Sequence, residues 1–167
     1  MIRTTFLSML AVFLFTVNVS VSIAADTAAI TADGKSVVTV TLPTGWSSVI
    51  SGEKTVLLPP GGAPHVQMWQ LSVASVAEAE KNAAALIVSQ VTEFKLASAT
   101  ALNVAGNPAR QLVGTGLEAD DGDPSHAEVT IFTVGGKIFL LVAHGEGDGT
   151  TKQHGEIMTI LTSAVAN

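Results

Sequence analysis

The sequence predicts an α+β fold in which an antiparallel β-sheet is covered by two helices. Two β-rich runs flank Gly135-Gly136, a run with helical spacing follows Ser75, and a second helical run closes the chain. A Gly-Gly pair between runs of Val, Ile, Phe and Thr indicates a β-hairpin, because both turn positions can take a positive φ. Helices this far apart in sequence, with hairpins between them, favour an α/β/α-type sandwich around an antiparallel sheet.

Residues 1–24 have the pattern of a signal peptide. Arg3 supplies a positive start, residues 6–17 are apolar, and Ser22-Ile23-Ala24-Ala25 is a small-residue cleavage site, with cleavage expected after Ala24. A retained anchor is the alternative, but polar residues from Asn18 onward interrupt the run before the roughly 20 apolar residues that a spanning helix needs. Residues 25–167 then have the size of one domain, and a periplasmic or secreted location follows.

Charge and composition exclude several classes of partner. Loss of Arg3 with the signal peptide changes the formal charge from −6 to −7. An acidic chain lacks the basic face that nucleic acids and anionic lipids require, so we expect no nucleic-acid partner and no adhesion to anionic lipid. No stretch after the signal peptide could span a membrane, so we also expect no stable membrane insertion after cleavage. The chain has no cysteine and no tyrosine. It therefore depends on its core rather than on disulfides, and offers few aromatic faces for stacking sugars or bases.

Turn residues divide the N-terminal half into short strands. Asp33-Gly34 predicts a tight turn, and Pro43 and Pro59-Pro60 end strands because proline cannot donate to a ladder. The expected strands cover 28–32, 36–42, 46–50, 56–58 and 65–73. In the last of these, alternation places Gln67, Trp69, Leu71 and Val73 on the side expected to face the core.

A capping box predicts the start of the first helix. The Ser75 hydroxyl can accept from the Glu78 amide while the Glu78 carboxylate accepts from the Ser75 amide, and apolar residues at helical spacing then extend to Phe94, giving a helix over about 76–94. Four further strands are expected, over 96–104, 108–116 and the two arms of the Gly135-Gly136 hairpin. The first arm alternates between apolar and polar residues, whereas the second, 138–143, is apolar throughout and typical of a strand buried on both faces.

The chain is expected to end in a second helix over about 150–165. Thr150-x-x-Gln153 can cap its start, and Ile157, Ile160, Leu161 and Val165 lie on one stripe.

The order of these elements resembles that of the PsbP-like superfamily and its small bacterial envelope relatives. The similarity rests on the Leu42-Pro43-x-Gly45-Trp46 strand exit, the long helix after the Trp69 strand, the Gly135-Gly136 hairpin and the C-terminal helix, and covers about residues 30–165. The resemblance implies a noncatalytic accessory or binding module on an antiparallel sheet covered by helices. No metal or partner residue of the photosynthetic members matches a position here.

His144-Gly-Glu146-Gly-Asp148, with His154 further on, is the first candidate for a ligand or metal site. Alternate residues of an extended chain point the same way, so the imidazole and two carboxylates could converge on a divalent cation, with His154 as a fourth ligand. The spacing matches no defined metal motif. In the simpler interpretation the glycines allow a turn, His144 ends the strand, and Asp148 lies near the positive end of the helix.

The acidic segment Glu118-Ala-Asp120-Asp121-Gly122-Asp123, with Glu128, suggests calcium, since a hard cation prefers clustered carboxylates. Its spacing does not fit an EF-hand, and a solvated acidic loop is favoured. Trp46 and Trp69 could line a ligand pocket, although aromatic residues in β-runs more often belong to the core. No cysteine or G-x-S-x-G motif provides a nucleophile.

These observations favour an exported accessory or binding module of the cell envelope, without catalysis or a cofactor, whose partner is a protein or a small ligand. Two alternatives remain open. One is a metal-binding protein or metal-dependent hydrolase that uses His144, Glu146, Asp148 and His154. The other is a carrier of a small apolar ligand, held between the first helix and the sheet and bounded by Trp46 or Trp69.

Overall fold

Two antiparallel sheets and three helices account for most of the computed structural model, which describes residues 26–167. The signal peptide expected at residues 1–24 lies outside the described residues. The strands are β1 Thr27–Ala32, β2 Lys35–Thr41, β3 Ser47–Ser51, β4 Lys54–Leu58, β5 His65–Leu71, β6 Val91–Val104, β7 Asn107–Glu118, β8 Pro124–Val134, β9 Lys137–Gly145 and β10 Val165–Ala166. The helices are α1 Val76–Lys81, α2 Ala83–Leu86 and α3 Gly149–Thr162.

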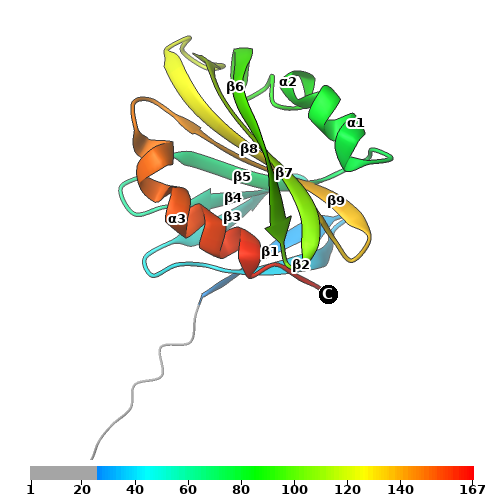
Figure 1. Ribbon diagram of the computed structural model, residues 1–167. Coiled ribbons are helices and arrows are strands. Elements are labelled where there is room, and N and C mark those ends of the chain that lie inside the picture. The colour runs from blue at the N-terminus through cyan, green and yellow to red at the C-terminus, as the bar shows by residue number, and fades with distance from the viewer. Residues whose placement is uncertain (1–25) are drawn as a thin grey trace, which may run out of the picture.

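The larger sheet has the strand order β3-β4-β5-β9-β8-β7-β6, and the smaller has the order β1-β2-β10. Helices α1 and α2 cover one face of the larger sheet, while α3 and the smaller sheet cover the other (Figure 1). The predicted α+β class and antiparallel pairing are confirmed. The expectation of one sheet and two helices is too simple, because a second sheet supplies part of the layer that a helix was expected to fill.

The β8–β9 hairpin lies at the centre of the larger sheet, as predicted. Gly135 and Gly136 have φ values of 58° and 75°, and Val134 pairs with Lys137 across this two-residue turn. Strand β9 is buried from Phe139 to Gly145, which confirms that it is covered on both faces. Strand β8 is buried almost as completely, although its sequence alternates, because polar residues on its second face lie under α3.

The first helix is much shorter than the predicted span of 76–94. Its start is confirmed in part: the Ser75 hydroxyl accepts from the Glu78 amide at 3.1 Å, but the Glu78 carboxylate accepts from the amide of Ala74 instead of Ser75. Asn82 separates α1 from the single turn of α2. Residues from Val91 onward form β6, because pairing with β7 outweighs the helical spacing of their apolar side chains.

The C-terminal helix ends three residues before its predicted end at Val165. Ile157, Ile160 and Leu161 are buried as expected, but Val165 is 63% exposed and belongs to β10, which pairs with β2. Asp148 is the N-cap and makes no side-chain capping bond, so the predicted Thr150 cap is wrong. No helix within residues 26–167 is both long and apolar enough to cross a membrane.

Strand β5 also departs from its predicted orientation. Val66 and Met68, on the side expected to face outward, are fully buried against the smaller sheet and α3, whereas Trp69 on the other side is only partly buried. Alternation alone could not identify the better-covered face, because both faces of this sheet carry a layer.

The hairpin turn gives a stability prediction. Alanine at either glycine must adopt a left-handed conformation, which costs about 1–2 kcal/mol. At Gly135 the added Cβ would also lie 2.9 Å from the Cβ of Ala166, whereas at Gly136 no heavy atom lies within 4 Å. We therefore expect Gly135→Ala to lower the free energy of unfolding more than Gly136→Ala in urea titrations. Adding Ala166→Gly to Gly135→Ala should recover the difference; equal losses in the two single variants would contradict the contact.

Candidate functional site

A carboxylate–histidine pair lies buried at one end of the larger sheet. His144, near the end of β9, and Glu118, the last residue of β7, approach with Nδ1 and Oε2 2.8 Å apart. Their side chains are only 7% and 9% exposed. The register of the β8–β9 hairpin places His144 beside Ala127 of β8, and the pairing of β9 with β5 places it beside His65. Glu118 is therefore not part of a solvated loop, as the sequence suggested, but a buried partner of the histidine.

A polar hollow of about 180 Å³ opens onto this pair, and we call it the His144 hollow. It is lined by His65, Gln67, Ser89, Gln90, Glu118, Ala119, Asp120 and His144. The His65 ring stacks on His144 with centroids 5.4 Å apart. The Ala119 amide donates to the Gln90 carbonyl at 2.9 Å, so the segment before β6 is fastened to the end of β7 and forms one wall.

The pair leaves two buried acceptor atoms without a partner. Burial lowers the pKa of His144, although the adjacent Glu118 carboxylate acts in the opposite direction. An ionised carboxylate can only accept, so the shared hydrogen belongs on Nδ1, and Nε2 of the neutral ring is an acceptor. Neither Nε2 nor Oε1 of Glu118 has a hydrogen-bond partner within the described residues. Buried acceptors of this kind are costly unless a donor reaches them.

The hollow does not contain a serine that is hydrogen-bonded to a base, as acyl transfer would require. Ser89 lines the hollow, but its hydroxyl is not bonded to Nε2 of His144, which has no partner in residues 26–167. A serine becomes a nucleophile when a base within hydrogen-bonding distance takes its proton. The arrangement instead offers acceptors for hydrogen bonds from a ligand.

A second carboxylate–histidine pair lies on the opposite face of the sheet, under α3. His154 Nδ1 is 2.8 Å from Oε2 of Glu128. The same oxygen accepts a hydrogen bond from the side-chain amide of Gln111 at 3.2 Å. The His154 side chain is 44% exposed, so this pair is open to solvent on one side. Trp46 also contacts α3: its indole nitrogen donates a hydrogen bond to the Glu156 carboxylate at 3.0 Å.

The structure does not bring the four residues of the predicted metal site together. His144 and His154 bond to different carboxylates on opposite faces of the sheet. Asp148 is exposed and pairs with Lys152 at 2.9 Å. Glu146 instead approaches Asp121 and Asp123, and one carboxylate oxygen from each of these exposed residues lies within 4.8 Å of the others.

The two tryptophans lie on different faces of the sheet and do not share a pocket. Trp46 is 2% exposed in the core beneath α3, and Trp69 is partly buried beside α1 and α2, with Lys54 Nζ 4.6 Å from its ring centroid. An apolar hollow of about 320 Å³ does lie between the first helix and the sheet, but other residues line it. They are Val76, Ala77, Glu80, Ala101, Leu102, Pro108, Ala109 and Arg110.

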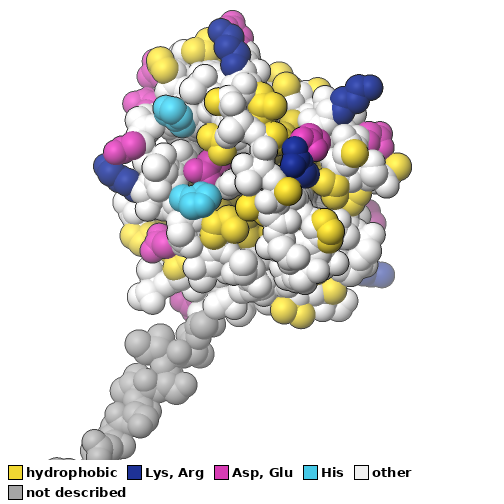
Figure 2. Space-filling view, in the orientation of Figure 1, with side chains coloured by type: hydrophobic (Ala, Val, Ile, Leu, Met, Phe, Trp, Pro, Cys, Tyr) yellow, Lys and Arg dark blue, Asp and Glu magenta, His cyan; other side chains and the backbone are white. Residues whose placement is uncertain are grey.

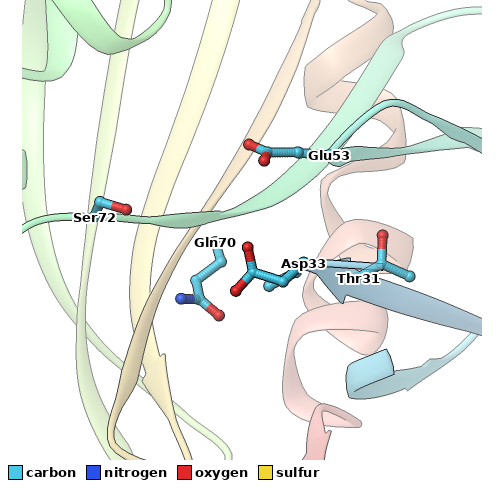
Figure 3. Close-up of a pocket in the computed structure, with 6 residues that line it drawn as sticks. Thr31, Asp33, Glu53, Gln70 and Ser72 are labelled. Atoms are coloured by element: carbon cyan, nitrogen blue, oxygen red, sulfur yellow. The ribbon is translucent and has the colours of Figure 1, made fainter. Parts of the chain in front are cut away.

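A smaller polar hollow of about 80 Å³ lies where the β1–β2 and β3–β4 turns meet the end of β5. Asp33, Glu53 and Gln70 are among its lining residues (Figure 3). Both carboxylates are exposed, and Gln70 is only partly buried. This hollow therefore lacks the buried, oriented pair that distinguishes the His144 hollow.

Four residues of the His144 hollow were not predicted from the sequence as site residues: His65, Gln67, Ser89 and Gln90. His65 is paired with His144 across β5 and β9, and a correct register of these strands would have identified it. Ser89 and Gln90 were assigned to the long helix, so their place beside the end of β7 could not be predicted.

Comparison with known proteins supports the fold. No protein-family model and no curated protein matches the sequence. Cyanobacterial PsbP (CyanoP) from Synechocystis is 17% identical, with a TM-score of 0.55 over 89% of this chain and 96% of that protein. LpqN from Mycobacterium tuberculosis is 14% identical, with a TM-score of 0.55 over 78% and 83% of the two chains.

A Bacteroides thetaiotaomicron structure is 12% identical and covers 78% of this chain with a TM-score of 0.54, while this chain spans only 45% of its length. The chain therefore has the PsbP-like fold that the order of its elements implied. At these identities the likeness concerns the fold.

The lowered pKa of His144 gives a pH prediction. Between that pKa and the value near 6.5 of an unfolded histidine, the unfolded state binds more protons, so stability falls as pH is lowered. The contribution is fully present above about pH 6.5. We expect the free energy of unfolding to fall between pH 7 and 5, and His144→Gln to flatten this dependence in urea titrations at each pH.

Three titratable groups face His144, namely Glu118, His65 and Asp120. All three are present in both the wild type and His144→Gln. His154→Gln is the matched control, because it removes the other paired histidine. It leaves the His144 pair intact, so its pH dependence should stay steeper than that of His144→Gln. A His144→Gln profile as steep as that of the wild type would show that another group is responsible.

Proposed function

We propose that the protein is an exported, noncatalytic binding module of the cell envelope whose ligand occupies the His144 hollow. The observation that carries this proposal is that His144 and Glu118, two residues that line the hollow, each have a buried acceptor, Nε2 and Oε1, with no partner within the described residues. A bound molecule that donates hydrogen bonds would satisfy both atoms. Buried polar groups without partners are uncommon in folded proteins, and a ligand site is one setting that accounts for them.

Two further features support the envelope, and a third bears on the class of partner. The sequence begins with the pattern of a signal peptide. Among proteins of this fold, LpqN is described as involved in cell envelope biogenesis. On the face shown in Figure 2, basic side chains lie beside acidic ones rather than in a basic patch, which argues against nucleic acid as the partner.

This proposal predicts where small hydrogen-bond donors bind. Titration with acetamide, which is neutral, and with methylammonium, which is cationic, should shift the backbone amide resonances of Gln90, Ala119 and His144 in ¹H–¹⁵N NMR spectra. The amides of α3, on the far face, should stay unchanged. If neither probe moves the resonances around the hollow at concentrations up to solubility, the proposed ligand site is wrong.

Metal binding is the second candidate function, and the proximity of Asp121, Asp123 and Glu146 favours it. All three side chains belong to exposed residues, and no histidine joins them. Clustered carboxylates suit a hard cation such as Ca²⁺ better than a transition metal.

A chelator separates the two candidates. If the binding module needs no metal, the melting temperature of the purified protein should be the same with and without EDTA, and elemental analysis should find no stoichiometric metal. A melting temperature that falls with EDTA, recovers with Ca²⁺ and no longer responds in Asp123→Asn would instead support the metal site.

A further inference from the structure

We infer that the His144 hollow binds the ammonium group of a small organic amine. This inference rests on the proposed function, since it names the chemical class of the ligand for the same hollow. It follows from the kind of atoms that the hollow presents, their charge and the size of the space.

The unpartnered atoms of His144 and Glu118, two residues that line the hollow, are both acceptors. Nε2 of His144 offers a lone pair once Nδ1 donates to Glu118, and Oε1 of Glu118 offers carboxylate lone pairs. Both side chains are more than nine-tenths buried, so their orientation is fixed by the sheet. An ammonium group has three donors and no acceptor, which complements such a site more fully than a hydroxyl with its single donor.

The charge of the hollow favours a cation. Glu118 and Asp120 are carboxylates that line it, and the hydrogen-bonded His144 is neutral near pH 7 because burial lowers its pKa. Glu118 forms no ion pair with a lysine or arginine within residues 26–167. Lys54 lies at the wall of the hollow, with Nζ 3.4 Å from the hydroxyl of the lining residue Ser89 and 4.6 Å from the centroid of the Trp69 ring, but it does not reach Glu118. A buried carboxylate gains most from a charged donor, because hydrogen bonds between charged partners are about twice as strong as neutral ones.

The size of the hollow favours an organic cation over a bare ion. Its volume of about 180 Å³ is many times the roughly 10–15 Å³ that a cavity needs to hold one water molecule. Within the described part of the chain, the one grouping of three side chains close enough to hold a metal is Asp121, Asp123 and Glu146, and none of these lines the hollow. The hollow is therefore not arranged as a metal site, and an anion would be repelled by its carboxylates.

Four probes that share a three-carbon chain test the inference by calorimetry and by NMR shifts at Gln90 and Ala119. Propylamine supplies an ammonium group, 1-propanol a neutral donor, propionate an anion, and trimethylpropylammonium a cation without N–H donors. We expect propylamine to bind at least tenfold more tightly than 1-propanol or trimethylpropylammonium, and propionate not to bind. Equal binding of propylamine and 1-propanol would overturn the amine inference and leave the proposed ligand site standing. Binding of none of the four would remove both.

Two carboxylate variants provide a matched comparison. Glu118→Gln keeps an acceptor for Nδ1 of His144 but removes the charge, and should weaken propylamine binding at least tenfold. Glu128→Gln removes the same charge from the other buried carboxylate–histidine pair, on the opposite face, and should leave binding unchanged. Equal losses in both variants, or none in Glu118→Gln, would contradict the assignment.

A variant at an exposed residue tests the inference even if Glu118→Gln does not fold. Asp120 lines the hollow and is exposed, so Asp120→Asn should retain the wild-type NMR spectrum away from the hollow. It should still weaken propylamine binding severalfold, because it removes the second carboxylate of the lining. A folded Asp120→Asn protein with undiminished affinity, together with a Glu118→Gln variant that binds as the wild type does, would overturn the inference.

Discussion

The structure depends on the central β8–β9 ladder, which is covered on both faces. Where a sheet is covered on both faces, a polar side chain beneath a covering layer is removed from water and needs a partner. The Gly135-Gly136 turn sets the register of this ladder, and the register directs His144 toward the α1–α2 face and Glu128 toward α3. Because side chains alternate with a period of two, a slip of one residue would exchange the two faces. The same turn that builds the core therefore also positions both carboxylate–histidine pairs.

The two pairs use the same chemistry in different surroundings. Glu128 accepts from Gln111 as well as bonding to His154, whose ring reaches solvent and lies on α3. That pair helps to fasten a helix to the sheet, as does the bond between Trp46 and Glu156. Glu118 and His144 are both nearly inaccessible, yet each keeps one unpartnered acceptor at the edge of a hollow. Spare hydrogen-bonding capacity on a buried pair beside a hollow therefore distinguishes the Glu118–His144 pair from the Glu128–His154 pair.

Local signals in the sequence predicted the strands and the hairpin well. Asp33-Gly34 and Gly135-Gly136 have the positive φ values that such turns need, and the apolar second arm of the hairpin is the buried β9. Non-local pairing explains why the predicted long helix does not form: residues from Val91 onward pair with β7 instead. For the same reason the predicted end of the second helix forms β10, which pairs with β2. These contacts join residues distant in sequence, so spacing within a segment could not reveal them.

The site was predicted only in part, for the same reason. His144 was singled out because it follows a buried apolar run, but its partner lies 26 residues earlier at the end of another strand. Glu146 was grouped with it on the assumption of an extended chain, whereas β9 ends at Gly145 and Gly147 has a φ of 63°. Alternation does not hold past the end of a strand.

The most direct test of this account is the protonation state of the His144 ring, measured by long-range ¹H–¹⁵N correlation NMR at pH 7 on the protein without added ligand. The account predicts a neutral ring with hydrogen on Nδ1 and none on Nε2. Hydrogen on Nε2, whether in the other neutral form or in an imidazolium, would leave the hollow without its second acceptor and would contradict the assigned site.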